Sequence, residues 1–393
     1  MPRWLDSFEE FAVDVILERR YGKRAALLRA FLNGLSRIYA PLVQARLALY
    51  RNRALKSHQL GIPVISIGNL TVGGTGKTPV VELFARALRD GGRRVAILSR
   101  GYKSERPPLL KRLLRRSREG PRVVSTGDGP LLDSALSGDE PYMLAKNLKG
   151  VAVFVDKNRV LGGLRAISDW GADLLLLDDG MQYQKLQHRI DVVLVDRQAP
   201  FGNEFLLPRG TLREPPRNLR RARYIFITKS QPGVSNSDLI TRIRKYNRTA
   251  EIIECRHRPV HLENLRTGER LPLSYLDGKY FGALSAIATP ESFENALRDL
   301  GALLELTLRH ADHHRFTEKE ILHFAERCVR RDVDAILTTE KDSVRIPPVD
   351  TGEMPILFLR VEIEILSGIE HWERCIRRLC EPAAPLRAGK LYA

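Results

Sequence analysis

The stretch Thr71-Val72-Gly73-Gly74-Thr75-Gly76-Lys77-Thr78 directly follows an apolar run from Pro63 to Leu70. A Gly-rich turn between a strand and a helix presents backbone N–H groups to phosphate oxygens, while its Lys reaches the β and γ phosphates and its Thr hydroxyl can bind Mg²⁺. The strict pattern begins with Gly where this chain has Thr71, so the match is to a variant P-loop. A merely structural turn rarely places Gly-Lys-Thr at such a junction. We therefore expect nucleotide phosphates to be held by Gly73, Gly74, Thr75, Gly76, Lys77 and Thr78.

Short β-branched and leucine-rich runs alternate with helical stretches after Gly61. Their nearly continuous hydrophobicity indicates strands that are buried on both faces. The alternation with helices predicts a doubly wound α/β domain with a mostly parallel sheet, as in P-loop NTPases. We expect its strands at Pro63–Ile67, Arg94–Leu98, Val151–Val155, Leu174–Leu177, Asp191–Val195 and Tyr224–Thr228.

A second, smaller α/β part is predicted beyond a turn-rich boundary between about Cys255 and Lys279. Its strands are expected at Phe281–Ser285, Ala335–Thr338 and Ile356–Val361, and its helices near Glu291–Leu300 and Glu318–Arg330. The predicted division is an N-terminal amphipathic helical segment over residues 1–56, a P-loop core over 57–255 and the smaller domain over 256–393.

The chain is strongly basic, with 64 Lys and Arg against 47 Asp and Glu in 393 residues, a formal net charge of +17. Such an excess points to an anionic partner: nucleic acid, a lipid surface or a phosphorylated substrate. Ordinary apolar and charged fractions, 43% and 28%, exclude wholesale disorder. The four cysteines lack the paired spacing of a zinc site, which favours a reduced, cytosolic compartment, and no apolar run reaches the roughly 18–20 residues of a spanning helix. Most of the basic excess lies in three runs, Arg19–Lys56, Lys103–Arg122 and Phe205–Arg223.

The first basic run has helical periodicity. Arg24, Arg29 and Arg37 fall outside its apolar set, a pattern that suits a helix lying in an anionic membrane interface. A helix packed on the protein's own core fits the same segment equally well. Pro41 is expected to kink or break the helix. The apolar set is Leu27, Leu28, Phe31, Leu32, Leu35, Ile38, Tyr39, Leu42 and Val43.

Two acidic pairs could serve a phosphoryl-transfer site, which needs carboxylates for a metal and a group that deprotonates an acceptor hydroxyl. Asp178 and Asp179 end an apolar run, where a Walker-B acid sits at the carboxyl end of a strand. Asp139 and Glu140 open a helix, and taken by itself such a pair is better explained as plain capping. Asp312-His313-His314 could be an oriented acid/base pair, a cap or a metal site.

These segments together resemble the tetraacyldisaccharide 4'-kinase family, the lipid A kinases of Gram-negative bacteria, from about Leu35 to Leu379. Each motif alone could be chance, but their number and order make the set specific. The motifs are Pro63 through Pro79, Ser99-Arg100-Gly101-Tyr102, Gly138-Asp139-Glu140-Pro141, Asp178-Asp179-Gly180, Phe201-Gly202-Asn203, Leu207-Pro208-Arg209-Gly210, Leu212-Arg213-Glu214, Asp312-His313-His314 and Thr339-Glu340-Lys341-Asp342.

The resemblance implies an ATP- and Mg²⁺-dependent kinase that phosphorylates the 4'-hydroxyl of a tetraacylated glucosamine disaccharide 1-phosphate at the cytoplasmic face of the bacterial inner membrane. It also implies a membrane-associated N-terminal helix and a C-terminal domain that closes over the core as a lid. The roles it implies are catalytic for Asp139, His313 and Lys77; metal-binding for Thr78, Glu140 and Asp178; and substrate-contacting for Asp179, Gln182, Arg100 and Asn203.

Two features depart from the family pattern. Tyr183 stands where the family commonly has His after its Asp-Asp-Gly motif, and the run Lys103–Arg122 is longer than usual. A rival hypothesis is a P-loop switch ATPase or GTPase of the partition or metallochaperone type, which often carries a second Lys at the position of Val72 and needs no Asp139/His313 pair. Nucleic-acid binding would explain the charge, but no interleaved aromatic residues or recognisable binding module support it.

Overall fold

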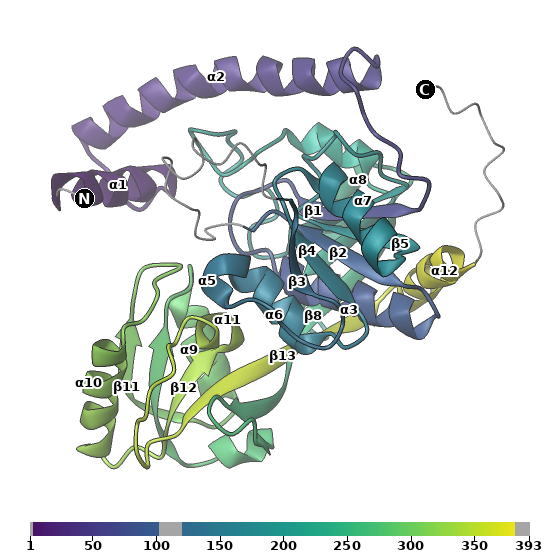
Figure 1. The fold of residues 1–393 in the computed structure, drawn as a ribbon. Helices are drawn as coiled ribbons and strands as arrows, with labels where there is room; N and C mark the ends of the chain where they lie inside the picture. The colour runs from purple at the N-terminus through teal and green to yellow at the C-terminus, as the bar shows by residue number, and fades with distance from the viewer. Residues whose placement is uncertain (1–2, 102–119, 382–393) are drawn as a thin grey trace, which may run out of the picture. The chain divides into compact units, whose positions relative to one another are not determined.

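The structure is a computed structural model that describes residues 3–101 and 120–381 (Figure 1). Most of the basic run Lys103–Arg122 therefore lies outside the described residues. The chain divides into two compact units: unit 1 combines residues 1–98, 163–256 and 365–393, and unit 2 combines 99–162 with 257–364. Residues 99–162, which the sequence analysis assigned to the P-loop core, thus group with the later part of the chain. The three-part division expected from the sequence stays a prediction.

Unit 1 is built on a parallel sheet in the strand order β2-β5-β1-β6-β7-β8. All of these strands except β8 are buried along nearly their whole length, which is why their sequences are continuous apolar runs. The bounds of these strands are β1 Val64–Asn69, β2 Val95–Ser99, β5 Leu174–Asp178, β6 Ile190–Asp196, β7 Tyr224–Thr228 and β8 Glu251–Asn264.

Helices flank this sheet in the manner of a doubly wound fold. Helix α12 packs on α3 through Trp372, whose ring meets that of Phe84 edge-on with centroids 4.8 Å apart. The helices with residues in unit 1 are α1 Arg3–Ile16, α2 Lys23–Arg51, α3 Lys77–Asp90, α7 Arg159–Trp170, the 3₁₀ helix η1 Pro216–Arg221, α8 Ser237–Arg244 and α12 Ile369–Cys380.

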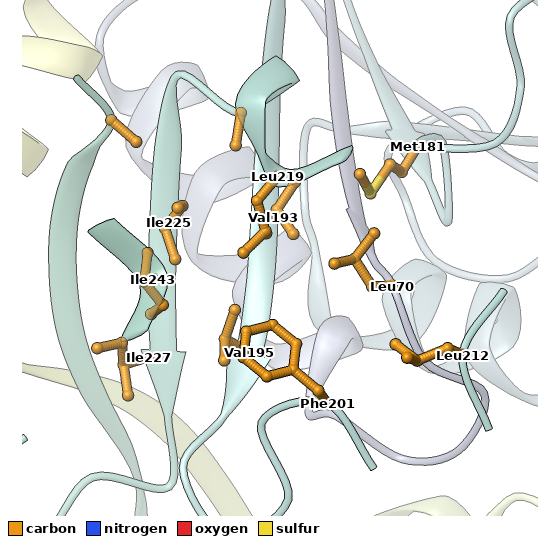
Figure 2. Close-up of a cluster of buried hydrophobic side chains, with 12 residues drawn as sticks. Leu70, Met181, Val193, Val195, Phe201, Leu212, Leu219, Ile225, Ile227 and Ile243 are labelled. Carbon is orange, nitrogen blue, oxygen red and sulfur yellow. The ribbon is translucent and has the colours of Figure 1, made fainter. Parts of the chain in front are cut away.

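A buried cluster beside β6 and β7 anchors the loops that carry the polar motifs (Figure 2). Leu70 enters it immediately before the P-loop, and Met181 enters it immediately after Asp178-Asp179-Gly180. Phe201 and Leu212 also belong to this cluster and anchor the segment between β6 and β7. Leu→Ala changes in such cores cost about 2–5 kcal/mol, so this cluster fixes the motif loops to the sheet.

Helix α2 is continuous from Lys23 to Arg51, with Pro41 inside it. The expected break at Pro41 is therefore wrong: the ring removes one backbone donor, but the hydrogen-bonded helix extends for more than two turns on either side. Within the described residues, none of the helices combines the length and apolar character needed to cross a bilayer.

The apolar residues of α2 lie on two faces, one half-buried and one exposed, and the membrane interpretation of the segment stays a prediction. Leu28, Leu32, Tyr39 and Val43 are half-buried against unit 1. An exposed stripe, which we call the outer stripe, runs along the other face at three- and four-residue steps as far as Leu42 and continues two turns later at Leu49, with Leu27 72% and Phe31 64% exposed. It consists of Leu27, Phe31, Leu35, Ile38, Leu42 and Leu49.

Side-chain hydrogen bonds to backbone carbonyls tie α2 to the motif loops of unit 1. Ser36 donates to Leu206 O at 3.0 Å, and the Tyr39 hydroxyl donates to Arg213 O at 3.0 Å. Arg46 reaches Gln182 O at 3.3 Å. The basic helix thus rests on the loops that follow β5 and β6.

Unit 2 contains a parallel sheet in the order β11-β10-β12-β13 and an antiparallel pair of β3 and β4. Strands β8 and β13 each have residues in both units. The bounds are β3 Arg122–Ser125, β4 Ala152–Val155, β9 Arg270–Leu271, β10 Tyr280–Ser285, β11 Leu303–Arg309, β12 Ala335–Thr339 and β13 Ile356–Ser367, and the helices are α5 Ser134–Ser137, α6 Asp139–Asn147, η2 Leu273–Leu276, α9 Pro290–Asp299, α10 Glu318–Val329 and α11 Glu340–Ser343.

The expected strands and helices are found, most of them within a few residues of their predicted bounds, but the sequence analysis missed four strands, β3, β8, β9 and β11. Strand β8 runs through the expected boundary at Cys255, and β3 was not expected at all. Edge strand β11 was missed because it pairs only with β10 among the described strands and alternates between exposed and half-buried residues. Its Glu305 and Thr307 interrupt the apolar run by which the buried strands were recognised.

Candidate active site

The P-loop motif joins β1 to α3, as expected. Gly73 and Gly76 adopt left-handed backbone conformations, with φ of +106° and +75°, which glycine adopts without the cost of a Cβ clash. The loop lies beside a second segment, because Val72 N donates to Thr211 O at 2.7 Å. Thr228, at the end of β7, donates to Thr75 O at 3.0 Å. The loop that opens the helix is thus held from two sides, with the N-terminus of α3 behind it.

Lys77 points into a small polar network rather than into solvent. Its Nζ lies 3.1 Å from Asp179 Oδ1 and 3.3 Å from Asn69 Oδ1, and its side chain is 11% exposed. Asn69, at the end of β1, also donates to Thr71 O at 2.8 Å. One amide therefore orients both the lysine and the first residue of the loop. Thr78 follows Lys77 in the first turn of α3.

The two aspartates at the end of β5 occupy different environments. Asp178 is 2% exposed at the last position of the strand. Asp179 has a left-handed φ of +53° and accepts from both Lys77 and Arg213, whose Nη1 lies 2.7 Å from Oδ2. Gly180 follows because a Cβ there would lie 2.6 Å from the Leu177 Cβ.

The pKa of Asp179 is set by competing effects. Burial alone would raise it, but the charges of Lys77 and Arg213 and the hydrogen bonds that they donate outweigh burial and lower the pKa to about 2. The carboxylate is therefore ionised throughout the neutral range. Its negative charge holds Lys77 at the loop.

Gln182 and Asn203 both use their side-chain amides to join segments of unit 1. Gln182 donates to Asn69 O at 3.1 Å and accepts from Arg213 at 3.3 Å, so it lies in the same network as Lys77. Asn203 donates to Ile16 O at 2.9 Å and accepts from Thr211 N at 3.1 Å. Both ends of the Asn203 amide are thus engaged by backbone, away from the Lys77 network.

The structure brings Asp139 and His313 together in unit 2. Asp139 is the first residue of α6 and is 7% exposed. Its Oδ2 lies 3.3 Å from His313 Nδ1, although 174 positions separate the two residues in the chain. Glu140, next to Asp139, is half-buried, and Arg100, after β2, is exposed. Thr78 and Asp178 belong to unit 1, whereas Glu140 belongs to unit 2.

Two arginines complete the surroundings of Asp139. Arg345 donates through Nε to Oδ2 at 2.8 Å, and Arg315 donates through Nη2 to Oδ1 at 3.1 Å. Burial works to raise the pKa of Asp139, but the His313 hydrogen bond and the two positive charges outweigh it, so the pKa is lower than usual. Asp139 is therefore a carboxylate at neutral pH.

His313 Nδ1 stands between a donor and an acceptor. Arg345 Nη2 lies 3.0 Å from it and can only donate, whereas Asp139 can only accept while it is ionised. A neutral His313 with its proton on Nδ1 can donate to Asp139, and one with its proton on Nε2 can accept from Arg345 at Nδ1. Neither tautomer forms both bonds. The backbone of His313 has a φ of +69°, and its backbone N–H donates to Ala286 O at 3.1 Å. Small proton shifts at this ring therefore change which neighbour it bonds.

The Thr339–Asp342 motif supports this pair. Arg345 has a fully buried side chain that bridges Asp139 to Asp342, at 2.9 Å from the latter. Burial raises the pKa of Asp342 despite its contacts with Ala286 N, Thr339 and Arg345. Glu340 is bonded to Arg360 at 2.6 Å and to Asn147 at 2.6 Å, so the motif also joins α6 to β13.

Sequence reasoning missed the partners of the charged groups. Arg213 was recognised only as part of a motif, although it shares Asp179 with Lys77. Arg315 and Arg345 were not considered, although both contact Asp139. Their nearness in sequence to the Asp312-His313-His314 and Thr339–Asp342 motifs was the one available signal.

Comparison of the chain with known proteins identifies its family. Residues 28–380 match the model of the tetraacyldisaccharide-1-P 4'-kinase family. The chain belongs to the tetraacyldisaccharide 4'-kinase family. A relative from Syntrophus aciditrophicus named tetraacyldisaccharide 4'-kinase is 36% identical over 350 residues, which cover 87% of this chain and 89% of the relative. One of the same name from Anaeromyxobacter sp. strain Fw109-5 is 39% identical over 83% of this chain and 85% of its own.

A solved structure supports the same assignment at the level of the fold. The apo form of LpxK from Aquifex aeolicus, in complex with ATP, superposes with a TM-score of 0.70 at 28% sequence identity. The match covers 90% of this chain and 99% of that one. The expected α/β fold of the P-loop type is confirmed, and the expected family is confirmed with it.

Proposed function

We propose that this kinase transfers the γ-phosphate of ATP to the 4'-hydroxyl of a tetraacylated glucosamine disaccharide 1-phosphate, a step of lipid A biosynthesis. The match to the kinase family over residues 28–380 carries the proposal. The geometry agrees with it: unit 1 presents a P-loop with a restrained lysine, and unit 2 presents a buried carboxylate beside a histidine. A switch ATPase would have no use for the second of these.

The phosphate side of the reaction belongs to unit 1. Backbone N–H groups from Gly73 to Thr78 would surround the phosphate oxygens of ATP, and the positive end of α3 would favour their charge. Lys77 would stabilise the negative charge on the transferred phosphoryl group, because Asp179 and Asn69 already hold its side chain at the loop. Pre-positioning of this kind lowers the reorganisation that the transition state requires.

The side chains at the P-loop also suit Mg²⁺, which prefers oxygen ligands. In unit 1, the Thr78 hydroxyl and the Asp178 carboxylate supply such oxygens, and Asp178 ends the strand next to β1. Glu140, whose role as a metal ligand rests on the family resemblance, belongs to unit 2. When bound, the ion neutralises charge on the phosphates as the acceptor oxygen attacks.

The acceptor side belongs to unit 2. Asp139 would act as the base that takes the proton of the 4'-hydroxyl, with His313 as its partner. The lowered pKa keeps Asp139 ionised, so its carboxylate can accept a proton. The His313 ring can carry its own proton either on Nδ1, which faces Asp139, or on the opposite nitrogen, Nε2. Arg345 and Arg315 hold the carboxylate in place.

The remaining predicted residues would contact the lipid or shape the site. Asp179 and Gln182 lie in the Lys77 network, so we assign them to the boundary between phosphate and acceptor. Arg100 is exposed and could meet the anionic 1-phosphate of the acceptor. Asn203 would act indirectly, by holding the loop that carries Thr211 against α1.

We further propose that the outer stripe of α2 inserts into the interface of the inner membrane on its cytoplasmic side. Six large apolar side chains share one exposed helix face, and the helix carries Arg and Lys but no acid. This combination suits an anionic bilayer surface better than water. Tyr39 of the same helix bonds Arg213 O, and the Arg213 side chain contacts Asp179 in the Lys77 network. A lipid substrate that enters along α2 would therefore arrive near the P-loop.

A vesicle-partition experiment tests the membrane proposal. The double variant Phe31→Ser/Ile38→Ser should reduce binding to vesicles that contain anionic phospholipid by about 10²-fold, since each large apolar side chain contributes about 1.5–3 kcal/mol when buried. Val329→Ser on α10, which also removes an exposed apolar side chain, is the matched control and should leave binding unchanged. Equal partition of all three proteins would contradict the proposal.

A transfer assay tests the kinase proposal. The purified chain, the detergent-solubilised disaccharide 1-phosphate lipid and radiolabelled Mg-ATP should yield a labelled lipid. ATP hydrolysis that ignores the lipid, with no label transferred to it, would instead support a switch ATPase.

A further inference from the structure

Helix α2 contacts two residues of the Lys77 network, an arrangement that the proposed reaction does not use. The Tyr39 hydroxyl donates to Arg213 O at 3.0 Å. Further along the helix, Arg46 donates to Gln182 O at 3.3 Å. Tyr39 and Arg46 are separated by about two helical turns, so a single face of α2 reaches both residues of the network.

The backbone of Arg213 is fixed from two directions. Its N–H donates to Leu70 O at 2.7 Å, at the residue that precedes the P-loop, and its carbonyl accepts from Tyr39. The pairing with the P-loop continues, because Val72 N donates to Thr211 O at 2.7 Å. The segment that ends at Arg213 is therefore bonded both to the start of the P-loop and to α2.

The Arg213 side chain connects this backbone to the carboxylate that holds Lys77. Its Nη1 lies 2.8 Å from Oδ1 and 2.7 Å from Oδ2 of Asp179, and 3.3 Å from Gln182 Oε1. The same Asp179 Oδ1 accepts from Lys77 Nζ at 3.1 Å. A displacement of Arg213 would therefore move Asp179 and, with it, the lysine. A continuous set of contacts joins Tyr39 to Lys77 within unit 1.

We propose that Tyr39 is a positioning residue for the reaction, which acts through Arg213 and Asp179 to hold Lys77 where it meets the nucleotide phosphates. This inference rests on the proposed role of Lys77. Docking of α2 and binding of nucleotide are then coupled, because both favour the same arrangement of the network. Such a coupling is reciprocal: loss of the Tyr39 bond weakens nucleotide binding, and bound nucleotide in turn holds α2 more firmly.

The nucleotide affinity of the full-length protein tests the proposal, measured with a fluorescent ATP analogue and Mg²⁺ in the absence of lipid substrate. Tyr39→Phe keeps the aromatic ring and removes only the hydroxyl. It should weaken nucleotide binding by about 2- to 10-fold, the factor that corresponds to the net contribution of one hydrogen bond. Unchanged affinity would overturn the proposal alone, whereas an unmodified chain that binds no nucleotide would contradict the proposed kinase function as well.

The matched control is Ser36→Ala, which removes a hydroxyl from the same helix. Ser36 donates to Leu206 O at 3.0 Å, but that carbonyl also accepts from Gly210 N at 3.0 Å and keeps this partner when the serine is replaced. Nucleotide affinity should therefore stay near that of the unmodified chain. Equal losses in Ser36→Ala and Tyr39→Phe would mean that α2 matters only through its packing, and would overturn the role of Tyr39.

A double-mutant cycle separates this route from a role in folding. Arg213→Met keeps a long side chain and removes the bonds to Asp179. In that background Tyr39→Phe should have almost no further effect on nucleotide affinity, because changes within one connected network do not add. Full additivity of the two effects would overturn the route through Arg213.

Hydrogen exchange tests the coupling in the reverse direction and does not depend on kinase activity. Bound ATP should slow amide exchange in α2 of the unmodified protein and of Ser36→Ala, but much less in Tyr39→Phe. Equal protection of α2 in all three proteins would contradict the coupling. A failure of the transfer assay would leave these binding and exchange results standing, so the two proposals are tested separately.

Discussion

The P-loop of unit 1 and the Asp139 site of unit 2 each centre on one ionised carboxylate, but they use it differently. In unit 1, Asp179 is shared by Lys77 and Arg213, so the acid holds the lysine that we propose to meet phosphate. In unit 2, Asp139 is the group that we propose to react, and Arg315, Arg345 and His313 hold it. The comparison teaches that the same kind of ionised carboxylate holds a single lysine at a loop in one unit and is itself held by several cationic and imidazole groups in the other.

The largest expected effect comes from removing the base. Asp139→Asn keeps the size of the side chain and one acceptor oxygen but cannot accept the proton, so turnover should fall by about 10²–10⁴-fold. Affinity for ATP, measured with a fluorescent nucleotide, should change little, because the P-loop belongs to unit 1. Loss of both together would mean that Asp139 holds the fold rather than performs the chemistry.

Lys77→Met should have the next largest effect, and it tests the role that we propose for unit 1, the binding of phosphate. Removal of one group that stabilises transition-state charge typically costs about 10²–10³-fold in turnover. Here nucleotide affinity should fall as well, since the same lysine meets the phosphates in the ground state. A variant with unchanged affinity and unchanged turnover would contradict the assignment of Lys77.

Arg345→Leu should act mainly on stability. Its guanidinium is buried between Asp139 and Asp342, and its loss removes the buried ion pair of Asp342 and one of the two arginines that pair with Asp139, at a cost of about 3–5 kcal/mol in the free energy of unfolding. Denaturant unfolding followed by circular dichroism would measure this change.

Arg331→Leu is the control for that experiment. Arg331 also forms an ion pair, with Glu305 at 2.6 Å, but its side chain is 60% exposed. Exposed pairs contribute about 0–1 kcal/mol, so this variant should unfold almost like the unmodified chain. Equal losses in the two variants would argue against a special role for the buried arginine.

The pH dependence of the two carboxylates should be nearly flat in the neutral range. Because their pKa values are depressed, both are ionised above about pH 5, and protonation removes their contributions only as the pH falls through the folded-state values. Turnover should therefore show no loss from protonation of Asp139 between pH 8 and pH 5, and the stabilising contribution of Asp179 should disappear only toward pH 2. A loss of turnover near neutral pH that Asp139→Asn abolishes would contradict the depressed pKa.

The sequence predicted the parts of this molecule that are local in the chain. The P-loop, the Asp178-Asp179 turn and the buried strands each occupy one short segment whose pattern reflects its own environment. The buried strands of unit 1 could be recognised because burial on both faces leaves only apolar residues. Edge strand β11 could not, since half of its residues face solvent.

The sequence did not predict what long-range folding creates. Arg213 and Arg345 look like ordinary basic residues in a chain of net charge +17, and only the fold shows that each lies against a buried acid. The same holds for the grouping of residues 99–162 with 257–364, because β8 and β13 cross between the units without a change in composition. The packing of one face of α2 could not be separated from the exposure of the other, because the helix is apolar on two faces, and the membrane interpretation stays a prediction.

The position of the new phosphate tests the central claim most directly. The lipid product of the reaction with Mg-ATP should be isolated and its phosphates located by tandem mass spectrometry and phosphorus NMR. We predict a bis-phosphorylated disaccharide whose second phosphate is on the 4'-oxygen, formed by the unmodified chain and at a strongly reduced rate by Asp139→Asn. A second phosphate at any other position, or an unmodified lipid beside hydrolysed ATP, would contradict the account.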